Sequence, residues 1–78
     1  MEVKLQVHTI DARGLKCPQP VIKLTIKAPQ IPAGDVIEIS GDCPTFEKDI
    51  QSWCSRMNKT ILEVIDMGDN AKKVKIQF

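Results

Sequence analysis

Apolar and polar residues alternate at both ends of this chain. A period of two is typical of a β-strand with one buried face. We therefore predict a first strand over residues 3–9 and a last strand near the C-terminus. The predicted core-facing residues are Val3, Leu5 and Val7 in the first strand and Val74, Ile76 and Phe78 in the last.

Residues 21–28 and 46–57 follow a different pattern, with apolar residues three or four positions apart. This spacing predicts two amphipathic helices. Pro29 and Pro32 end the first helix, because proline cannot continue the hydrogen-bonding pattern. The predicted apolar positions are Val21, Ile22, Leu24, Ile26 and Ala28 in the first helix, and Phe46, Ile50, Trp53, Cys54 and Met57 in the second.

Two further strands complete the prediction, over residues 36–40 and 60–67, and residues 68–70 form a hairpin turn. The order β-α-β-α-β-β favours parallel strands joined by right-handed crossovers, followed by an antiparallel hairpin. We expect an α+β fold, a two-layer α/β sandwich with a mixed four-stranded sheet and two helices on one face. Residues 1–78 are expected to form a single domain.

The net charge is +1, with 11 basic and 10 acidic residues, which gives no electrostatic reason to expect nucleic-acid or membrane binding. Lys72, Lys73 and Lys75 are interpreted as a solvated strand face.

A domain of 78 residues has a thin core and no room for a deep active-site cavity. We expect a cytoplasmic monomer, since no targeting segment is evident and three cysteines do not make a disulfide framework.

The segment Cys17-Pro18-Gln19-Pro20 stands where the first strand gives way to a helix. Proline is favoured in the first turn of a helix and keeps the preceding residue out of helical geometry. Cys17 is therefore predicted at the N-terminal end of the helix, where free N–H groups and the helix dipole stabilise a thiolate. Lys16 and Arg13 add positive charge nearby.

Around this segment the chain resembles the TusA-like (SirA-like) sulfur-carrier family. The resemblance rests on Asp11-Ala-Arg-Gly14, on Leu15 to Pro20, and on Asp42-Cys43-Pro44, and it extends over essentially the whole chain. It implies the same two-layer fold and a persulfide carried on Cys17. It also implies a donor protein of the cysteine desulfurase or rhodanese type and an acceptor protein, in tRNA thiolation or related sulfur trafficking.

Two positions depart from the family pattern. Gln19 stands where many members have Glu, and Cys43 stands where a second acidic residue commonly precedes the proline. The protein is expected to be a carrier rather than a complete enzyme, because it supplies a nucleophile but no evident substrate pocket. No cofactor is expected.

The other thiols allow more than one interpretation. Cys43-Pro44 repeats the local arrangement of Cys17-Pro18, so Cys43 is either an incidental semi-buried thiol or a second sulfur site near Cys17. Cys54 is interpreted as a core residue. The cysteine spacing contains no Cys-x-x-Cys metal knuckle, and His8 is predicted on the polar strand face, away from the helices.

Two alternatives to the carrier remain open from the sequence. In one, the Cys-Pro-x-Pro segment is structural and the protein is a non-catalytic regulatory interaction module. In the other, Cys17 and Cys43 form a thiol redox sensor.

Overall fold

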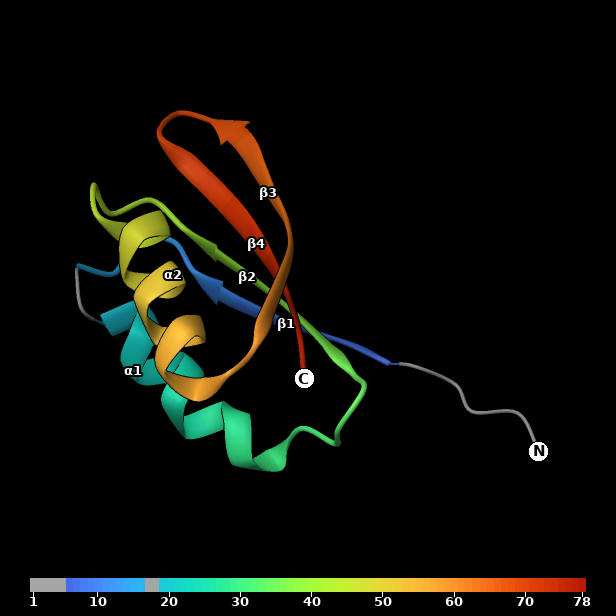
Figure 1. The fold of residues 1–78 in the computed structure, drawn as a ribbon. Helices are drawn as coiled ribbons and strands as arrows, with labels where there is room; N and C mark the ends of the chain where they lie inside the picture. The colour runs from blue at the N-terminus through green and yellow to red at the C-terminus, as the bar shows by residue number, and fades with distance from the viewer. Residues whose placement is uncertain (1–5, 17–18) are drawn as a thin grey trace.

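The computed structural model describes residues 6–16 and 19–78. Within these ranges the elements follow the predicted order (Figure 1). They are β1 (Val7–Ala12), α1 (Gln19–Lys27), a short 3-10 turn (Ala28–Gln30), β2 (Val36–Gly41), α2 (Phe46–Met57), β3 (Thr60–Gly68) and β4 (Ala71–Gln77).

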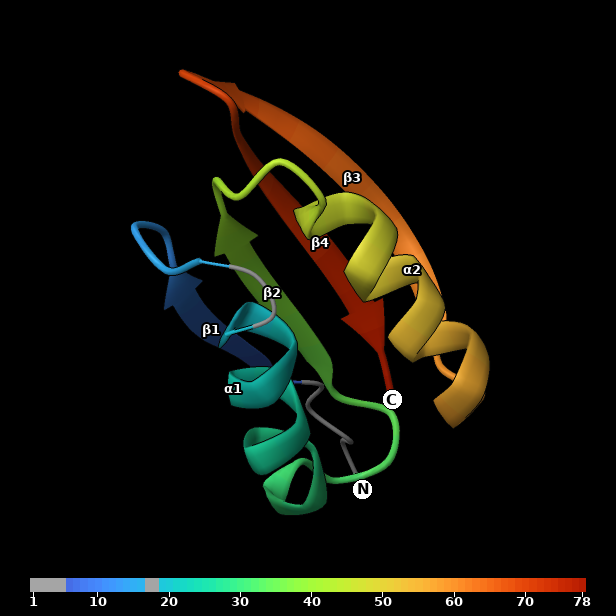
Figure 2. The ribbon, with the colours of Figure 1, turned by 90° about the vertical axis from the view of Figure 1, so that its left-hand side faces the viewer.

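The described strands form one mixed sheet in the order β1-β2-β4-β3. β1 runs parallel to β2, whereas β4 is antiparallel to both β2 and β3. Both α1 and α2 cover the same face of this sheet, which confirms the predicted two-layer α+β architecture (Figures 1 and 2). The position of β4 between β2 and β3 was not predicted from the sequence.

The core lies between the helices and the two central strands. Ile37 and Ile39 of β2 and Val74 and Ile76 of β4 are completely buried. Trp53, one of the predicted apolar positions of the second helix, is 3% exposed. Its indole Nε1 donates a hydrogen bond to Thr25 Oγ1 at 3.1 Å, which links α2 to α1.

The predicted first strand was wrong in its bounds and in its buried face. β1 extends to Ala12, and Val7 is 58% exposed, whereas Ile10 and Ala12 are buried. His8 pairs in register with buried Ile37, so it shares the helix-covered face instead of the open one. Apolar residues occur at both odd-numbered and even-numbered positions of this segment. The pairing with β2 decides which of the two sets faces the core. Val3 and Leu5 lie outside the described residues.

Three predicted core positions on the helices were also wrong. Ile22 and Ile26 of α1 are 44% and 65% exposed, and Met57 of α2 is 49% exposed. α1 packs only against the half of the sheet that contains β1 and β2. A narrow apolar stripe that includes Leu24 is therefore enough to fill the contact between this helix and the sheet. Met57 stands in the last turn of α2, next to Asn58, which ends the helix in a left-handed conformation with φ of 56°.

The three C-terminal lysines do not form one face. Lys73 and Lys75 lie 3.9 and 3.4 Å from the carboxylate of Glu38 on the neighbouring strand β2. Lys72 points to the helix side, where its Nζ lies 2.8 Å from Glu47 Oε1 of α2. Nearby carboxylates therefore compensate each of these positive charges, so they do not add up to a basic patch.

A hydrogen bond between the side chains of His8 and Asp35 links the start of β1 to the loop before β2. His8 Nε2 lies 2.9 Å from Asp35 Oδ2, and the backbone N–H of Gln6 donates to Asp35 Oδ1 at 3.3 Å. The hydrogen bond with His8, assisted by that of Gln6, lowers the pKa of Asp35 below its ordinary value of 3.8. A carboxylate with a lowered folded-state pKa stabilises the fold above its ordinary pKa, and this contribution is lost as pH falls through the folded-state value.

Asp35→Asn is expected to lower the urea midpoint of unfolding at neutral pH, because it removes the charged partner of His8. The difference from the wild type should shrink as pH falls from about 3.8 through the lowered folded-state pKa, below which the wild-type carboxylate is also protonated. Asp11→Asn is the matched control, since Asp11 forms a solvent-exposed pair with Arg13 and exposed pairs contribute little. A difference for Asp35→Asn that persists undiminished at the lowest pH would contradict this assignment.

Gly41 ends β2 directly beneath the ring of Phe46, and a Cβ atom at Gly41 would overlap that ring. Gly41→Ala is therefore expected to lower the free energy of unfolding by about 1–3 kcal/mol, the usual cost of overpacking a core. Chemical denaturation of a double-mutant cycle with Phe46→Leu tests the cause. The cost of Gly41→Ala should fall when the ring is absent, and strictly additive effects would refute the proposed clash.

Candidate functional site

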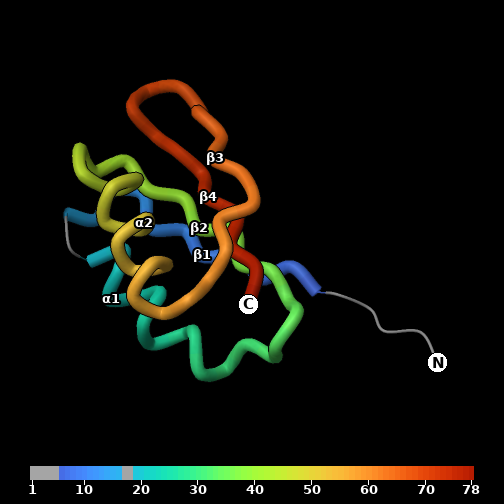
Figure 3. Tube along the Cα trace, viewed as in Figure 1, coloured from blue at the N-terminus to red at the C-terminus, as the bar shows by residue number. Residues whose placement is uncertain are grey.

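The two Cys-Pro segments follow neighbouring parallel strands. Ala12 of β1 is directly opposite Gly41 of β2, and each strand ends there. The turns that follow lie side by side at this edge of the sheet (Figures 2 and 3). The backbone N–H of Gly14 in the first turn donates to Asp42 Oδ1 in the second at 3.0 Å. Gly14 has φ of 83°, a conformation that favours glycine.

Cys17 and Pro18 lie outside the described residues, so the predicted placement of the Cys17 sulfur stays a prediction. The residues on either side are described. The N–H of Gln19 donates to the carbonyl of Lys16 at 2.8 Å. Lys16 and Gln19 are exposed, whereas Pro20 is buried.

The first turns of α1 and α2 differ in their charged residues. Its first turn contains no acidic residue, and Lys27 stands in its last turn. The first turn of α2, by contrast, contains Glu47 and Asp49. Carboxylates in the first turn neutralise the positive end of a helix dipole. The first turn of α1 therefore lacks the compensating carboxylates that the first turn of α2 contains.

Arg13 was predicted to add positive charge near Cys17. Its Nε and Nη2 donate hydrogen bonds to the two carboxylate oxygens of Asp11, at 3.0 and 3.2 Å. These hydrogen bonds raise the pKa of Arg13 and lower that of Asp11. The guanidinium charge is therefore matched by a carboxylate two residues away, which leaves Lys16 and the helix terminus as sources of positive potential on this side.

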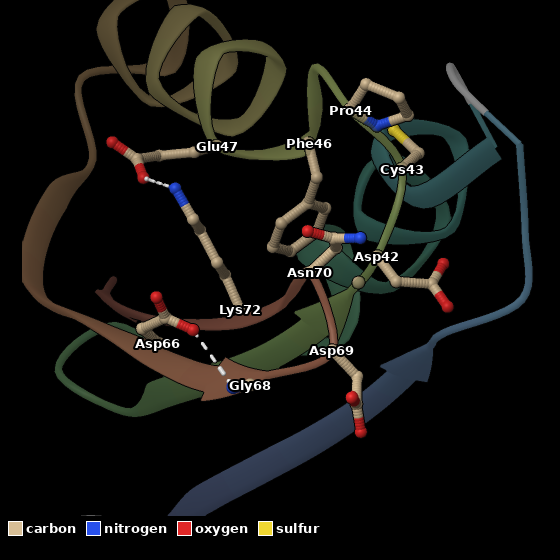
Figure 4. A pocket seen from close by; sticks show the side chains of 11 residues that line it. Asp42, Cys43, Pro44, Phe46, Glu47, Asp66, Gly68, Asp69, Asn70 and Lys72 are labelled. Atoms are coloured by element: carbon tan, nitrogen blue, oxygen red, sulfur yellow. Dashed lines mark hydrogen bonds and ion pairs between the residues drawn. The ribbon is translucent and has the colours of Figure 1, made fainter.

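Cys43 lies in the second turn and is only 9% exposed. Its carbonyl accepts a hydrogen bond from the N–H of Phe46 at 3.0 Å, which starts α2. An open recess of about 630 Å³ adjoins this turn. Figure 4 shows Asp42, Cys43 and Pro44 on one side of the recess and Glu47, Asp66 and Lys72 on the other.

Cys54 is a free thiol in the core and is 3% exposed, which confirms the interpretation from the sequence. Burial raises its pKa to about 11. Cys54 is therefore protonated at neutral pH and shielded from reagents, and it is a poor nucleophile.

Sequence reasoning missed the contribution of Asp42. Its carboxylate ties the two turns together, and the signal was present in the sequence as a glycine after one strand and an aspartate after the next.

Among residues 6–16 and 19–78, no group of His, Cys, Asp and Glu side chains is arranged to hold a metal ion. In the same part of the chain, no helix is long and apolar enough to span a membrane.

Comparison with known proteins adds the decisive observation. Residues 8–77 match the family described as "Sulfurtransferase TusA". The chain belongs to the TusA family. This membership supports a sulfur-carrier role, and proteins of this family interact with sulfur donor and acceptor proteins.

A solved structure agrees with this assignment. The chain is similar to the crystal structure of a SirA-like protein from Desulfitobacterium hafniense, with a TM-score of 0.79 and 26% sequence identity. The match covers 91% of this chain and 95% of that protein. The resemblance predicted from the sequence is thereby confirmed at the level of family and fold.

Asp42→Ala is expected to loosen the two turns, because it leaves the Gly14 amide without its acceptor. The free energy of unfolding should fall by about 1 kcal/mol. Hydrogen exchange of the Gly14 amide, followed by NMR, should accelerate about fivefold. Asp42→Asn, which keeps an acceptor oxygen, should recover most of the protection.

Glu63→Ala is the charge-matched control, since Glu63 lies on β3 and is 57% exposed. It should leave the Gly14 exchange rate unchanged. Equal Gly14 protection in the wild type and in Asp42→Ala would show that the hydrogen bond does not tie the turns.

Proposed function

We propose that this protein is a sulfur carrier that relays a sulfur atom as a persulfide on Cys17. Membership of the TusA family carries the proposal, since it supports transfer of sulfur between proteins. The assignment to Cys17 is supported by its position in the sequence, directly before a helix whose first turn lacks carboxylates. Such a helix end stabilises a thiolate, which is the nucleophilic form of cysteine.

The chemistry consists of two displacements at sulfur. The Cys17 thiolate attacks the terminal sulfur of a donor persulfide, a new S–S bond forms, and the donor thiolate leaves. The resulting Cys17 persulfide then offers its terminal sulfur to a nucleophile on the acceptor. When that bond forms, the Cys17 thiolate leaves and the carrier returns to its starting state, so no external oxidant or reductant is consumed.

Burial argues against the other cysteines as the carrying residue. Cys54 is 3% exposed with a pKa of about 11, and Cys43 is 9% exposed. A carrier must present its sulfur to two partner proteins in turn. The described residues that flank Cys17, Lys16 and Gln19, are exposed and leave this side of the molecule accessible.

A cysteine desulfurase or a rhodanese-type protein is the proposed class of donor. Both classes carry a protein persulfide and therefore match the first displacement. The proposed destination is a thiolation reaction such as that of tRNA, in a reducing compartment such as the cytoplasm, through an acceptor protein rather than through direct nucleic-acid binding.

Incubation with a cysteine desulfurase and free cysteine is expected to add one sulfur atom to the protein, detected by intact mass spectrometry. Cys17→Ser should abolish this gain, because it removes the attacking thiolate. Cys54→Ser is the matched control and should retain the gain, since Cys54 is buried in the core.

The added sulfur should be released by a dithiol reductant, as expected for a persulfide. Mass gain in Cys17→Ser equal to that of the wild type would reassign the carrier residue. No mass gain in any variant, with either a desulfurase or a rhodanese-type donor, would refute the carrier function.

A further inference from the structure

The outer edge of β1 is a strand edge that lies beside an open groove. In the sheet order β1-β2-β4-β3, β1 pairs only with β2 among the described strands. We propose that this edge and its groove bind an extended acidic segment of a partner protein, which joins the sheet as a further strand. The inference does not depend on the proposed sulfur-carrier function.

The backbone of β1 offers hydrogen-bonding groups along this edge. The carbonyl of Gln6 accepts a hydrogen bond from the N–H of Val36, so it points toward β2. In a parallel pair with a continuous register, every second residue directs its N–H and C=O to the paired strand, and the residues between them direct theirs away from it. Val7, Thr9 and Asp11 therefore direct their backbone groups away from β2. A row of such groups is a template for another strand.

The other edge strand of the sheet, β3, is less suited to such pairing. Its register with β4 shifts at two places, around Leu62 and around Met67. Bulges of this kind bend and twist an edge away from a further strand. The register of β1 with β2 is continuous from Val7 to Ala12. β1 is therefore the edge that can accept a strand over its whole length.

An open groove of about 390 Å³ lies between this edge and α1. β1 contributes Thr9 and Asp11 to its lining, and α1 contributes Lys23, Ile26 and Lys27. Figure 2 shows α1 packed beside β1 at this side of the sheet. Ile26 is 65% exposed, and a strand laid along β1 would cover its side chain. The groove thus offers an apolar contact next to the backbone groups of the edge.

The charge of the groove favours an acidic partner. α1 contains Lys23 and Lys27 and no acidic residue. The carboxylate of Asp11 already accepts two hydrogen bonds from the side chain of Arg13. Among the ion pairs of the described residues, none includes Lys23 or Lys27. The groove therefore has an excess of positive charge, which carboxylates on an incoming strand would complement.

The edge also determines the kind of molecule that binds. A polypeptide supplies the alternating N–H and C=O groups that pair with a strand edge, whereas a nucleic acid does not. Addition of an extended peptide to a sheet edge is a known mode of recognition, in which the backbone gives affinity and the side chains give specificity. An extended acidic segment satisfies both the backbone and the lysines.

The test is an NMR titration with a blocked peptide in which glutamate and valine alternate, six residues long to match β1. Its side chains place carboxylates on one face only, so they can meet the lysines of α1. The amide signals of β1 and of Lys23 to Lys27 should shift, and hydrogen exchange of the Thr9 and Asp11 amides should slow at least about fivefold at saturation. A peptide with lysine in place of glutamate should bind at least about tenfold more weakly.

Two methylated forms of the peptide test whether it binds as a strand. One is methylated at the backbone nitrogens of the valines and the other at those of the glutamates. Because alternate N–H groups of a strand point to opposite sides, only one form loses hydrogen bonds to β1 and should lose binding. Equal binding by both forms would show that no strand pairing occurs and would overturn the proposal.

Variants of the protein locate the site. Lys23→Gln/Lys27→Gln should weaken binding about fivefold, since two exposed charge pairs are lost. Lys48→Gln/Arg56→Gln removes the same charge from exposed positions of α2 and is the matched control, which should bind as the wild type does. Thr9→Pro should abolish binding while keeping the hydrogen bonds to β2, because the lost N–H points away from that strand. The amide spectrum verifies that each variant is folded.

The remaining outcomes each contradict the proposal. Absence of shifts at millimolar peptide, or equal affinity for the glutamate and lysine peptides, would refute an acidic partner at this edge. Shifts of the same amides on raising the protein concentration without peptide would show that a second copy of the chain occupies the edge instead. Loss of binding in the α2 control equal to that in the α1 variant would place the site elsewhere.

Discussion

The parallel pairing of β1 with β2 is the interaction on which the arrangement of the candidate site depends. It sets the ends of the two strands level, so that Ala12 and Gly41 are neighbours and both turns leave the sheet at the same edge. The Asp42 carboxylate continues this pairing into the turns through the Gly14 amide. A slip of one residue in this register would reverse the buried face of β1 and would also separate the turns.

The helices then give these similar turns different properties. Each is followed by a helix packed on the same face of the sheet, but only α2 has carboxylates in its first turn. The difference comes from a few side chains and not from the backbone. Two turns that share a Cys-Pro pair therefore precede helices whose first turns differ in charge.

The sequence predicted the element order and most of the core, because the helical and strand periods are clear over residues 36–57 and 74–78. It failed to predict which side chains of β1 face the core, because this depends on the register with β2, in which His8 pairs with Ile37. It also failed for Ile22 and Ile26, because a helical stripe does not reveal how wide a surface the sheet offers. Asp42 was missed because its partner, Gly14, is 28 residues away in the sequence. Cys17 could be singled out because its signal is local.

The buried thiol of Cys54 has a consequence for studying the protein as a whole. It is 3% exposed and packs in the cluster that contains Trp53 and Ile50. A reagent that modifies thiols can reach it only when α2 separates from the sheet. If these openings close faster than the reagent reacts, the rate of Cys54 modification measures the free energy of local or global unfolding in the absence of denaturant. The chain thus contains a natural probe of its own opening.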